Sequence, residues 1–140
     1  TEGRANKEGR MIDPQLTPNF NLTEWKCHDG TQCPFDLVDN VKQCAENLQV
    51  LRDAIDKPIY ILSGYRNPTY NNRIGGAKKS YHMTGKAADI RVKGMAPAEV
   101  AAVIERLIGE GKMEQGGIGV YDEDGFTHYD CRGTRARWKG

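Results

Sequence analysis

The three histidines of the chain are the residues with the clearest chemical potential, because a neutral imidazole is both a common metal ligand and an acid–base group near pH 7. His82 is followed closely by Gly85, which permits a tight turn before the residues that lead to Asp89. His128 lies in a short alternating run far along the chain. A turn and two strands could therefore bring His82, Asp89 and His128 to one point.

Two histidines and one aspartate are a suitable ligand set for catalytic zinc. Such a zinc ion takes three protein nitrogen or oxygen ligands and keeps a fourth position for water, which the metal makes more acidic. The same residue types also serve as hydrogen-bonded structural groups. Spacing alone therefore leaves both interpretations open.

The order of several short motifs adds a second line of evidence, because it resembles the zinc D-Ala-D-Ala carboxypeptidase family, which includes VanY-like and VanX-like enzymes and phage endolysin peptidases. The resemblance covers roughly residues 19–138. Its motifs are Ser63-Gly64-Tyr65-Arg66, Asn71-Asn72, Gly75-Gly76-Ala77, Ser80-x-His82-x-x-Gly85-x-Ala87-x-Asp89 and Phe126-x-His128-x-Asp130.

The resemblance implies a role for each site residue. His82, Asp89 and His128 are expected to bind Zn²⁺, and Arg66 is expected to steady the substrate or the oxyanion that develops on the attacked carbonyl. A guanidinium suits that role because its planar donors carry a permanent charge. The alternative for Arg66 is a surface ion pair. Ser80 is expected either to bind polar groups of the substrate or to orient the turn that carries His82.

The sequence departs from the family at the general base. Many relatives have Glu or Asp three residues before the final ligand, or His two residues before it, whereas this chain has Gly125 and Phe126. Asp130 is the first substitute, because it lies two residues beyond His128 on the same strand face. Asp130 is equally suited to orienting a ligand. The acidic residues 122–124 form a further option within a hairpin loop.

Other reactive or charged residues have weaker claims. His28 has no matching ligand pattern and is expected to be solvated. The basic segment 132–137 could meet an anionic wall polymer, but a solvated terminal strap is the favoured interpretation. Cys27 and Cys33 flank a short loop and could form a bridge, although all four cysteines are expected to be free thiols.

The elements that position the candidate site follow from the hydrophobic pattern. Apolar residues recur at helical spacing between residues 37 and 55, and Lys57-Pro58 ends that helix. The run 59–62 predicts a buried strand. Residues 63–81 are rich in Gly, Asn, Pro and Ser, which predicts a loop with one helical turn at residues 70–73.

Two further segments complete the predicted sheet and its cover. Residues 86–92 alternate so that Asp89 faces away from Ile90, and residues 97–108 predict a second helix that begins at a proline. Residues 117–121 and 126–130 predict an antiparallel hairpin. The fold class is therefore α+β, with a small, mainly antiparallel sheet covered by helices mainly on one face, and the family resemblance implies a hedgehog-like fold.

Length and composition limit the function classes. The 140 residues fit a single domain, expected at residues 18–140, after a tail or strap at residues 1–17. Twenty basic residues oppose nineteen acidic ones, so the net charge of +1 provides no drive toward nucleic acid. No apolar run is long enough for a membrane span, no signal peptide is visible, and nothing indicates an oligomer, so a monomer is expected.

The expected function is that of a zinc metallopeptidase that hydrolyses a peptide bond in peptidoglycan stem peptides or cross-links. Such a protein acts on the cell wall from the periplasmic or extracellular side, or after delivery by a bacteriophage. The alternative is a zinc-stabilised module that binds peptidoglycan or has a structural role without catalysis. A zinc nuclease is disfavoured by the balanced charge.

Overall fold

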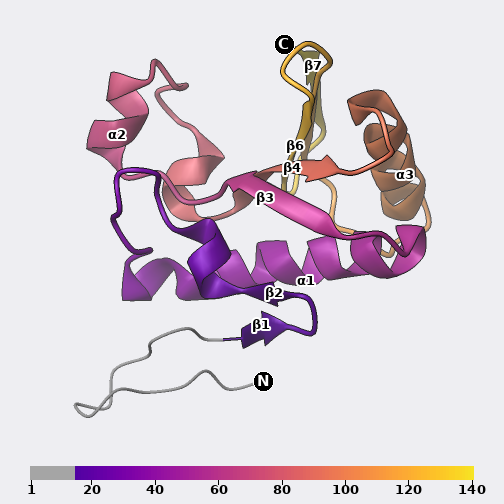
Figure 1. Ribbon diagram of the computed structural model, residues 1–140, viewed down its shortest axis with the longest axis horizontal. Helices are drawn as coiled ribbons and strands as arrows, with labels where there is room; N and C mark the ends of the chain where they lie inside the picture. The colour runs from indigo at the N-terminus through magenta and orange to yellow at the C-terminus, as the bar shows by residue number, and fades with distance from the viewer. Residues whose placement is uncertain (1–14) are drawn as a thin grey trace.

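The computed structural model describes residues 15–140, and its main feature is a five-stranded sheet in the order β3-β4-β6-β5-β7 (Figure 1). Its strands are β3 (Ile59–Ser63), β4 (Ala87–Val92), β5 (Gly117–Tyr121), β6 (Phe126–Asp130) and β7 (Ala136–Lys139). All neighbouring pairs are antiparallel except β5 and β7, which run parallel. A small second sheet pairs β1 (Gln15–Thr17) with β2 (Phe20–Asn21).

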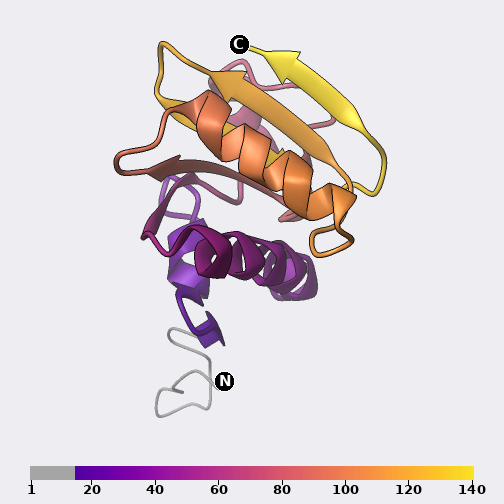
Figure 2. The same cartoon turned by 90° about the vertical axis from the view of Figure 1, so that its right-hand side faces the viewer.

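Two long helices pack on one face of the main sheet, as Figure 2 shows from the side of α3. They are α1 (Val38–Ile55) and α3 (Pro97–Gly109). Helix α1 ends at Ile55, and the next residue, Asp56, adopts the left-handed conformation that closes many helices. Helix α3 begins with Pro97, and the Glu99 side chain accepts a hydrogen bond from the backbone N–H of Ala96 at 2.8 Å.

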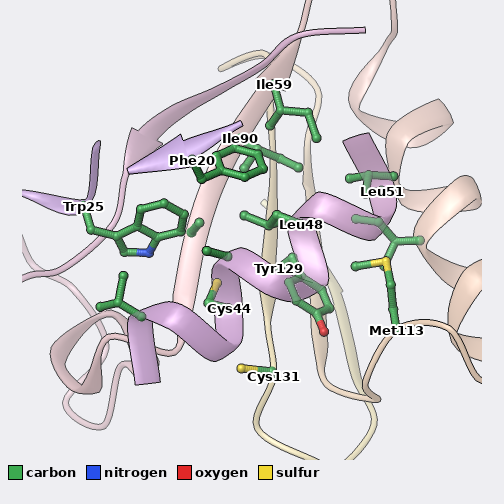
Figure 3. Close-up of a cluster of buried hydrophobic side chains, with 14 of the residues drawn as sticks. Phe20, Trp25, Cys44, Leu48, Leu51, Ile59, Ile90, Met113, Tyr129 and Cys131 are labelled. Carbon is green, nitrogen blue, oxygen red and sulfur yellow. The ribbon is translucent and has the colours of Figure 1, made fainter. Parts of the chain in front are cut away.

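The hydrophobic core lies between these helices and the inward face of the sheet (Figure 3). Leu48 and Leu51 of α1 meet Ile90 of β4 and Tyr129 of β6 there, and all four are fully buried. The Tyr129 hydroxyl donates a hydrogen bond to the carbonyl of Glu114 at 2.8 Å, so its polar end is satisfied. Since neighbouring residues on a strand alternate between faces, Asp89 and His128 point away from this core.

Short helical elements lie within the loops of the chain. They are η1 (Leu22–Trp25), η2 (Phe35–Leu37), α2 (Pro68–Arg73) and η3 (Tyr81–Thr84). Helix α2 begins at Asn67, whose side chain accepts a hydrogen bond from the N–H of Tyr70 at 2.7 Å. Helix α2 and η3 belong to the long loop predicted between β3 and β4.

The structure confirms the α+β fold class and the mainly antiparallel sheet with its helical cover. The predicted strap at the C-terminus is wrong in part, because residues 136–139 form β7 at the sheet edge. Arg137 on this strand forms an ion pair with Glu105 of α3, with Nε to Oε2 at 2.6 Å, and this pair connects the edge strand to the helix. The basic segment is therefore partly a structural element.

The ends of the chain and its cysteines complete the comparison. Residues 15–17 of the predicted tail form β1, and Leu16 and Thr17 are buried; residues 1–14, and with them most of the tail and signal-peptide predictions, lie outside the described residues. All four cysteines are buried free thiols. Among residues 15–140, no helix combines the length and apolar character needed to cross a membrane.

Candidate metal centre

Strand pairing sets the candidate site out as a row across the sheet. Asp89 on β4 pairs with His128 on β6, which pairs with Gly119 on β5, which pairs with Trp138 on β7. Residues paired in register share a face, and this row lies on the face opposite α1 and α3. Gly119 has no side chain, so the Trp138 indole lies over it and comes within 5.0 Å of the His128 ring, centroid to centroid.

His82 joins this row from the loop side. It lies in η3, and the Oγ of Ser80 accepts a hydrogen bond from the His82 backbone N–H at 3.2 Å. Gly85 ends η3 in the left-handed conformation, and a Cβ at that position would come within 2.9 Å of the Val41 side chain. The turn that carries His82 thus needs both its serine cap and its glycine.

His82, Asp89 and His128 form the group that could hold a metal ion, since their ligand atoms all lie within 4.8 Å of one another. Oδ1 of Asp89 is 3.3 Å from Nε2 of His82 and 3.1 Å from Nδ1 of His128. Atoms that each lie about 2.0–2.2 Å from a tetrahedral zinc are roughly 3.3–3.6 Å apart, so the two distances from Asp89 are near that spacing. Among the described residues this is the one such group.

Hydrogen bonds behind the two imidazoles direct their metal-facing nitrogens. Nδ1 of His82 lies 2.7 Å from the carbonyl oxygen of Gly64, and Nε2 of His128 lies 2.6 Å from Oδ2 of Asp130. A carbonyl or an ionised carboxylate can only accept, so each of these nitrogens carries the proton. The lone pairs of His82 Nε2 and His128 Nδ1 are left for a metal, which is the arrangement typical of ligand histidines.

The three residues are buried, with exposed fractions of 3% for His82, 6% for Asp89 and 8% for His128. Burial lowers the pKa of His82, which favours the neutral imidazole that a metal requires. Burial alone would raise the pKa of Asp89, but the polar contacts of its carboxylate with the His128 and His82 rings outweigh burial and lower that pKa. The carboxylate is therefore ionised at neutral pH.

Asp130 lies behind His128 rather than in front of it. Burial alone would raise its pKa, but hydrogen bonds with Arg132 and His128 lower it. The residue is fully buried, and its Oδ1 accepts from the backbone N–H of Gly117 at 3.0 Å and from Nε of Arg132 at 2.8 Å. Of the two roles considered for Asp130, this geometry favours orientation of His128 over proton transfer.

Arg66 reaches the group from the end of β3. Its NH2 lies 3.4 Å from Oδ2 of Asp89, while the oxygen that faces both histidines is Oδ1. Nε donates to Oγ of Ser63 at 3.3 Å, and NH1 to Oδ1 of Asn71 at 3.4 Å. The Arg66 side chain is 16% exposed, so the surface ion pair considered as the alternative is instead a largely buried contact beside the candidate metal ligands.

The three residues lie in a cleft of about 470 Å³ between the sheet and the loop that carries α2 and η3. Among residues 15–140, Asp89 is the only carboxylate in its lining. The cleft is lined by Arg66, Gly75, Gly76, Ala77, Lys79, Ser80, Tyr81, His82, Asp89, Tyr121, Phe126, His128, Arg132 and Trp138.

Some predicted residues lie elsewhere, and some residues of the cleft were not predicted. His28 is exposed, and its Nε2 lies 2.6 Å from the carbonyl of Leu62, outside the cleft. Trp138, Tyr121 and Arg132 also line the cleft. Sequence reasoning named neither aromatic residue as a binding residue, and it considered Arg132 only as part of the basic segment 132–137. Alternation along β6 gave the position of Asp130, but the parallel pairing that brings Trp138 to His128 has no local signal.

Comparison with known proteins places this geometry in context. A model of the family described as Peptidase M15 matches residues 15–130. The peptidoglycan L,D-endopeptidase MepK of Escherichia coli (strain K12) is 34% identical over 87 residues, which cover 59% of this chain and 44% of that protein. The zinc D-Ala-D-Ala carboxypeptidase of Streptomyces albus G is 37% identical over 130 residues, which cover 88% of this chain and 50% of that protein.

A third relative is the probable peptidoglycan L,D-endopeptidase MepK of Haemophilus influenzae (strain ATCC 51907 / DSM 11121 / KW20 / Rd). It is 33% identical over 106 residues, which cover 72% of this chain and 53% of that protein. The chain thus spans about half the length of the relatives it matches.

Proposed function

Because the chain belongs to the Peptidase M15 family, we propose that it is a zinc metallopeptidase that hydrolyses a peptide bond in peptidoglycan stem peptides or cross-links. The observation that carries the proposal is the convergence of His82, Asp89 and His128 at one point of a cleft. Hydrogen bonds to Gly64 and Asp130 hold one ring nitrogen of each histidine, and the other ring nitrogen faces that point. The names of the relatives support both zinc and peptidoglycan.

We assign the ligand role to His82, Asp89 and His128. Zinc held by them would supply an acidified water and polarise the scissile carbonyl. Asp130 keeps the proton of His128 on Nε2, so that Nδ1 stays available to the metal. Ser80 acts first as the cap of the turn that carries His82, and its place in the cleft lining leaves it available to polar groups of the substrate.

Arg66 is the residue we assign to the developing negative charge. Ser63, Asn71 and Asp89 hold its guanidinium at the cleft, so little reorganisation is needed when the carbonyl oxygen gains charge. Arg66 also donates its backbone N–H to the carbonyl of His82 at 3.1 Å. Its position is therefore coupled to that of a ligand.

We propose the bacterial cell wall as the place of action, reached from the periplasmic or extracellular side or by delivery from a bacteriophage, as for an endolysin. The relatives named as peptidoglycan endopeptidases support action at the cell wall.

We propose a monomer, because one chain supplies every residue of the group. A single peak of about 15.6 kDa on calibrated gel filtration is the expected readout.

A zinc-stabilised module without hydrolysis is the second candidate. It is favoured by the cleft lining, in which Asp89 is the sole carboxylate among residues 15–140 and serves the metal group. A metallopeptidase needs a group that accepts the proton of the attacking water. Loss of that group would leave a protein that binds metal and wall peptide without cleaving.

Digestion of purified peptidoglycan distinguishes the two candidates. The zinc-loaded chain is expected to release soluble peptides that chromatography and mass spectrometry detect, and a chelator should stop the release until zinc is restored. The fragment masses also identify the bond. One equivalent of bound zinc with no released peptide, across several wall types, would refute the peptidase and favour the module.

Asp130→Asn is expected to weaken zinc binding by about 10- to 100-fold, because the neutral amide no longer holds the His128 proton on Nε2. Competition with a chromophoric chelator measures the Kd. Asp124→Asn, on the exposed tip of the β5–β6 hairpin, is the matched control and should leave the Kd unchanged. An unchanged Kd for Asp130→Asn would remove the positioning role.

A further inference from the structure

Arg132 is a cation of the cleft that the assigned roles leave unused, and its guanidinium is fixed on several sides. Nε and NH2 form a bidentate ion pair with Oδ1 and Oδ2 of Asp130, each at 2.8 Å. Asp130 is fully buried and hydrogen-bonded to His128, so its carboxylate is a fixed partner for the guanidinium. A planar fork held at two points has one orientation.

Two aromatic rings restrict the same guanidinium further. Its central carbon lies 4.5 Å from the centre of the Tyr81 ring and 5.5 Å from that of Trp138. Trp138 is itself fixed, because its Nε1–H donates to the hydroxyl of Tyr121 at 2.8 Å. Arg132 therefore contacts two aromatic rings of the cleft lining, one from η3 and one from β7.

The sheet leaves room for this arrangement at Gly117. A Cβ at Gly117 would lie 2.4 Å from Oδ2 of Asp130 and 2.7 Å from NH2 of Arg132. Gly117 pairs with Asp130 in the register of β5 and β6, just as Gly119 pairs with His128. Two glycines of one strand thus make space for the ion pair and for the indole.

Part of the guanidinium remains free to bind a ligand. The bidentate pair uses Nε and one hydrogen of NH2, whereas NH1 has no hydrogen-bond partner among residues 15–140. The Arg132 side chain is 22% exposed and lines the cleft that contains the candidate metal ligands. Arg66 and Lys79 line it too. Among the described residues, Asp89 is the one acidic side chain of the lining, so the lining has more basic than acidic side chains.

We infer that Arg132 binds a carboxylate of the peptide in this cleft and so determines specificity for acidic peptides. The inference rests on the proposed function for the identity of the substrate as a wall peptide. Arg132 lies just beyond residue 130, where the family match ends, so that match does not assign it. The carboxylate is either the C-terminal group of the peptide or that of an acidic residue within it.

Kinetics on one synthetic stem pentapeptide in three forms tests this role. The forms have all carboxylates free, only the terminal carboxylate amidated, or only the internal carboxylates amidated. The zinc-loaded chain should prefer the free form over one amidated form by about 10- to 100-fold in kcat/KM, as expected for a charge-assisted hydrogen bond. The form that loses activity identifies the source of the carboxylate.

Arg132→Gln should remove that preference, lowering kcat/KM on the free form by the same factor while changing the amidated form by less than about threefold. Arg132→Lys should restore part of the preference, because the charge remains without the planar fork. Arg135→Gln removes an exposed arginine of the same segment, outside this cleft, and should keep the preference intact. Equal losses on all three forms would overturn the inference and leave Arg132 with a structural role through Asp130.

Binding of the same peptides, measured by calorimetry, separates this inference from the proposed function. If the zinc-loaded chain cleaves none of them, tighter binding of the free form, lost in Arg132→Gln, still supports the carboxylate site while the peptidase fails. Equal binding of all three forms refutes the site. Thermal unfolding of each variant confirms that the compared chains are folded, and Arg132→Lys serves as the test if the glutamine variant is not.

Discussion

His82→Ala abolishes stoichiometric zinc binding and, with it, peptidoglycan hydrolysis; this is the largest effect we expect. His82 supplies one of three candidate ligands, and its Nε2 is 3.3 Å from the shared Asp89 oxygen. Removal of a hydrogen-bond partner behind a ligand costs about 10- to 100-fold in metal affinity or activity, so removal of a ligand should cost more. Alanine also leaves the carbonyl of Gly64 without its 2.7 Å partner.

Elemental analysis after gel filtration measures the first part of this result, and released wall peptides measure the second. The intact chain should retain about one zinc per molecule under conditions that strip the variant, as expected for a three-ligand protein site. His28→Ala is the matched control, because His28 is exposed and bonded to Leu62 outside the cleft. Full zinc occupancy in His82→Ala would contradict the assignment and show that other residues bind the metal.

The helices and the hairpin were predictable because their signals are local. Leu48 and Leu51 belong to an apolar stripe with helical spacing, which indicates both the element and its buried face. The β5–β6 pairing follows from two alternating runs around a short turn. These elements form from residues near in sequence, so the pattern carries most of the information.

The β7 strand could not be predicted in the same way. It has four residues, two of them basic, and it pairs with β5 in parallel. Parallel strands are not joined by a tight hairpin turn, so no turn sequence indicates this pairing. Arg137 looks like a solvated charge in the sequence but pairs with Glu105 on a helix far earlier in the chain. Its role depends on tertiary neighbours alone.

In the candidate site, too, local sequence patterns predicted some features, whereas others depend on tertiary neighbours. The order of motifs gave His82, Asp89 and His128 as one group, and alternation gave the shared face of His128 and Asp130. Neither could decide whether Asp130 faces the cleft or lies behind the imidazole, since that depends on Arg132 and Gly117. The register of the sheet edge also determines which side chains line the cleft beside His128.

Arg66→Gln should lower kcat by about 100- to 1,000-fold with a small change in KM, the second-largest effect we expect. A donor placed where charge develops in the transition state contributes about that much when it is removed. The glutamine side chain is polar but shorter and without charge, so binding of the uncharged ground state should change less. The kcat of Arg66→Lys should lie between those of the intact chain and of Arg66→Gln, because lysine keeps the charge without a planar fork.

The zinc content of each variant separates this catalytic role from an indirect one. Arg66 contacts Oδ2 of Asp89 at 3.4 Å, whereas Oδ1 is the oxygen nearest both histidines, so the glutamine variant should keep about one zinc. Arg73→Gln, an exposed arginine at the end of α2, is the control for loss of a positive charge near the same loop. If kcat falls only in proportion to zinc occupancy, Arg66 positions Asp89; if kcat falls at full occupancy, the guanidinium acts on the reacting carbonyl.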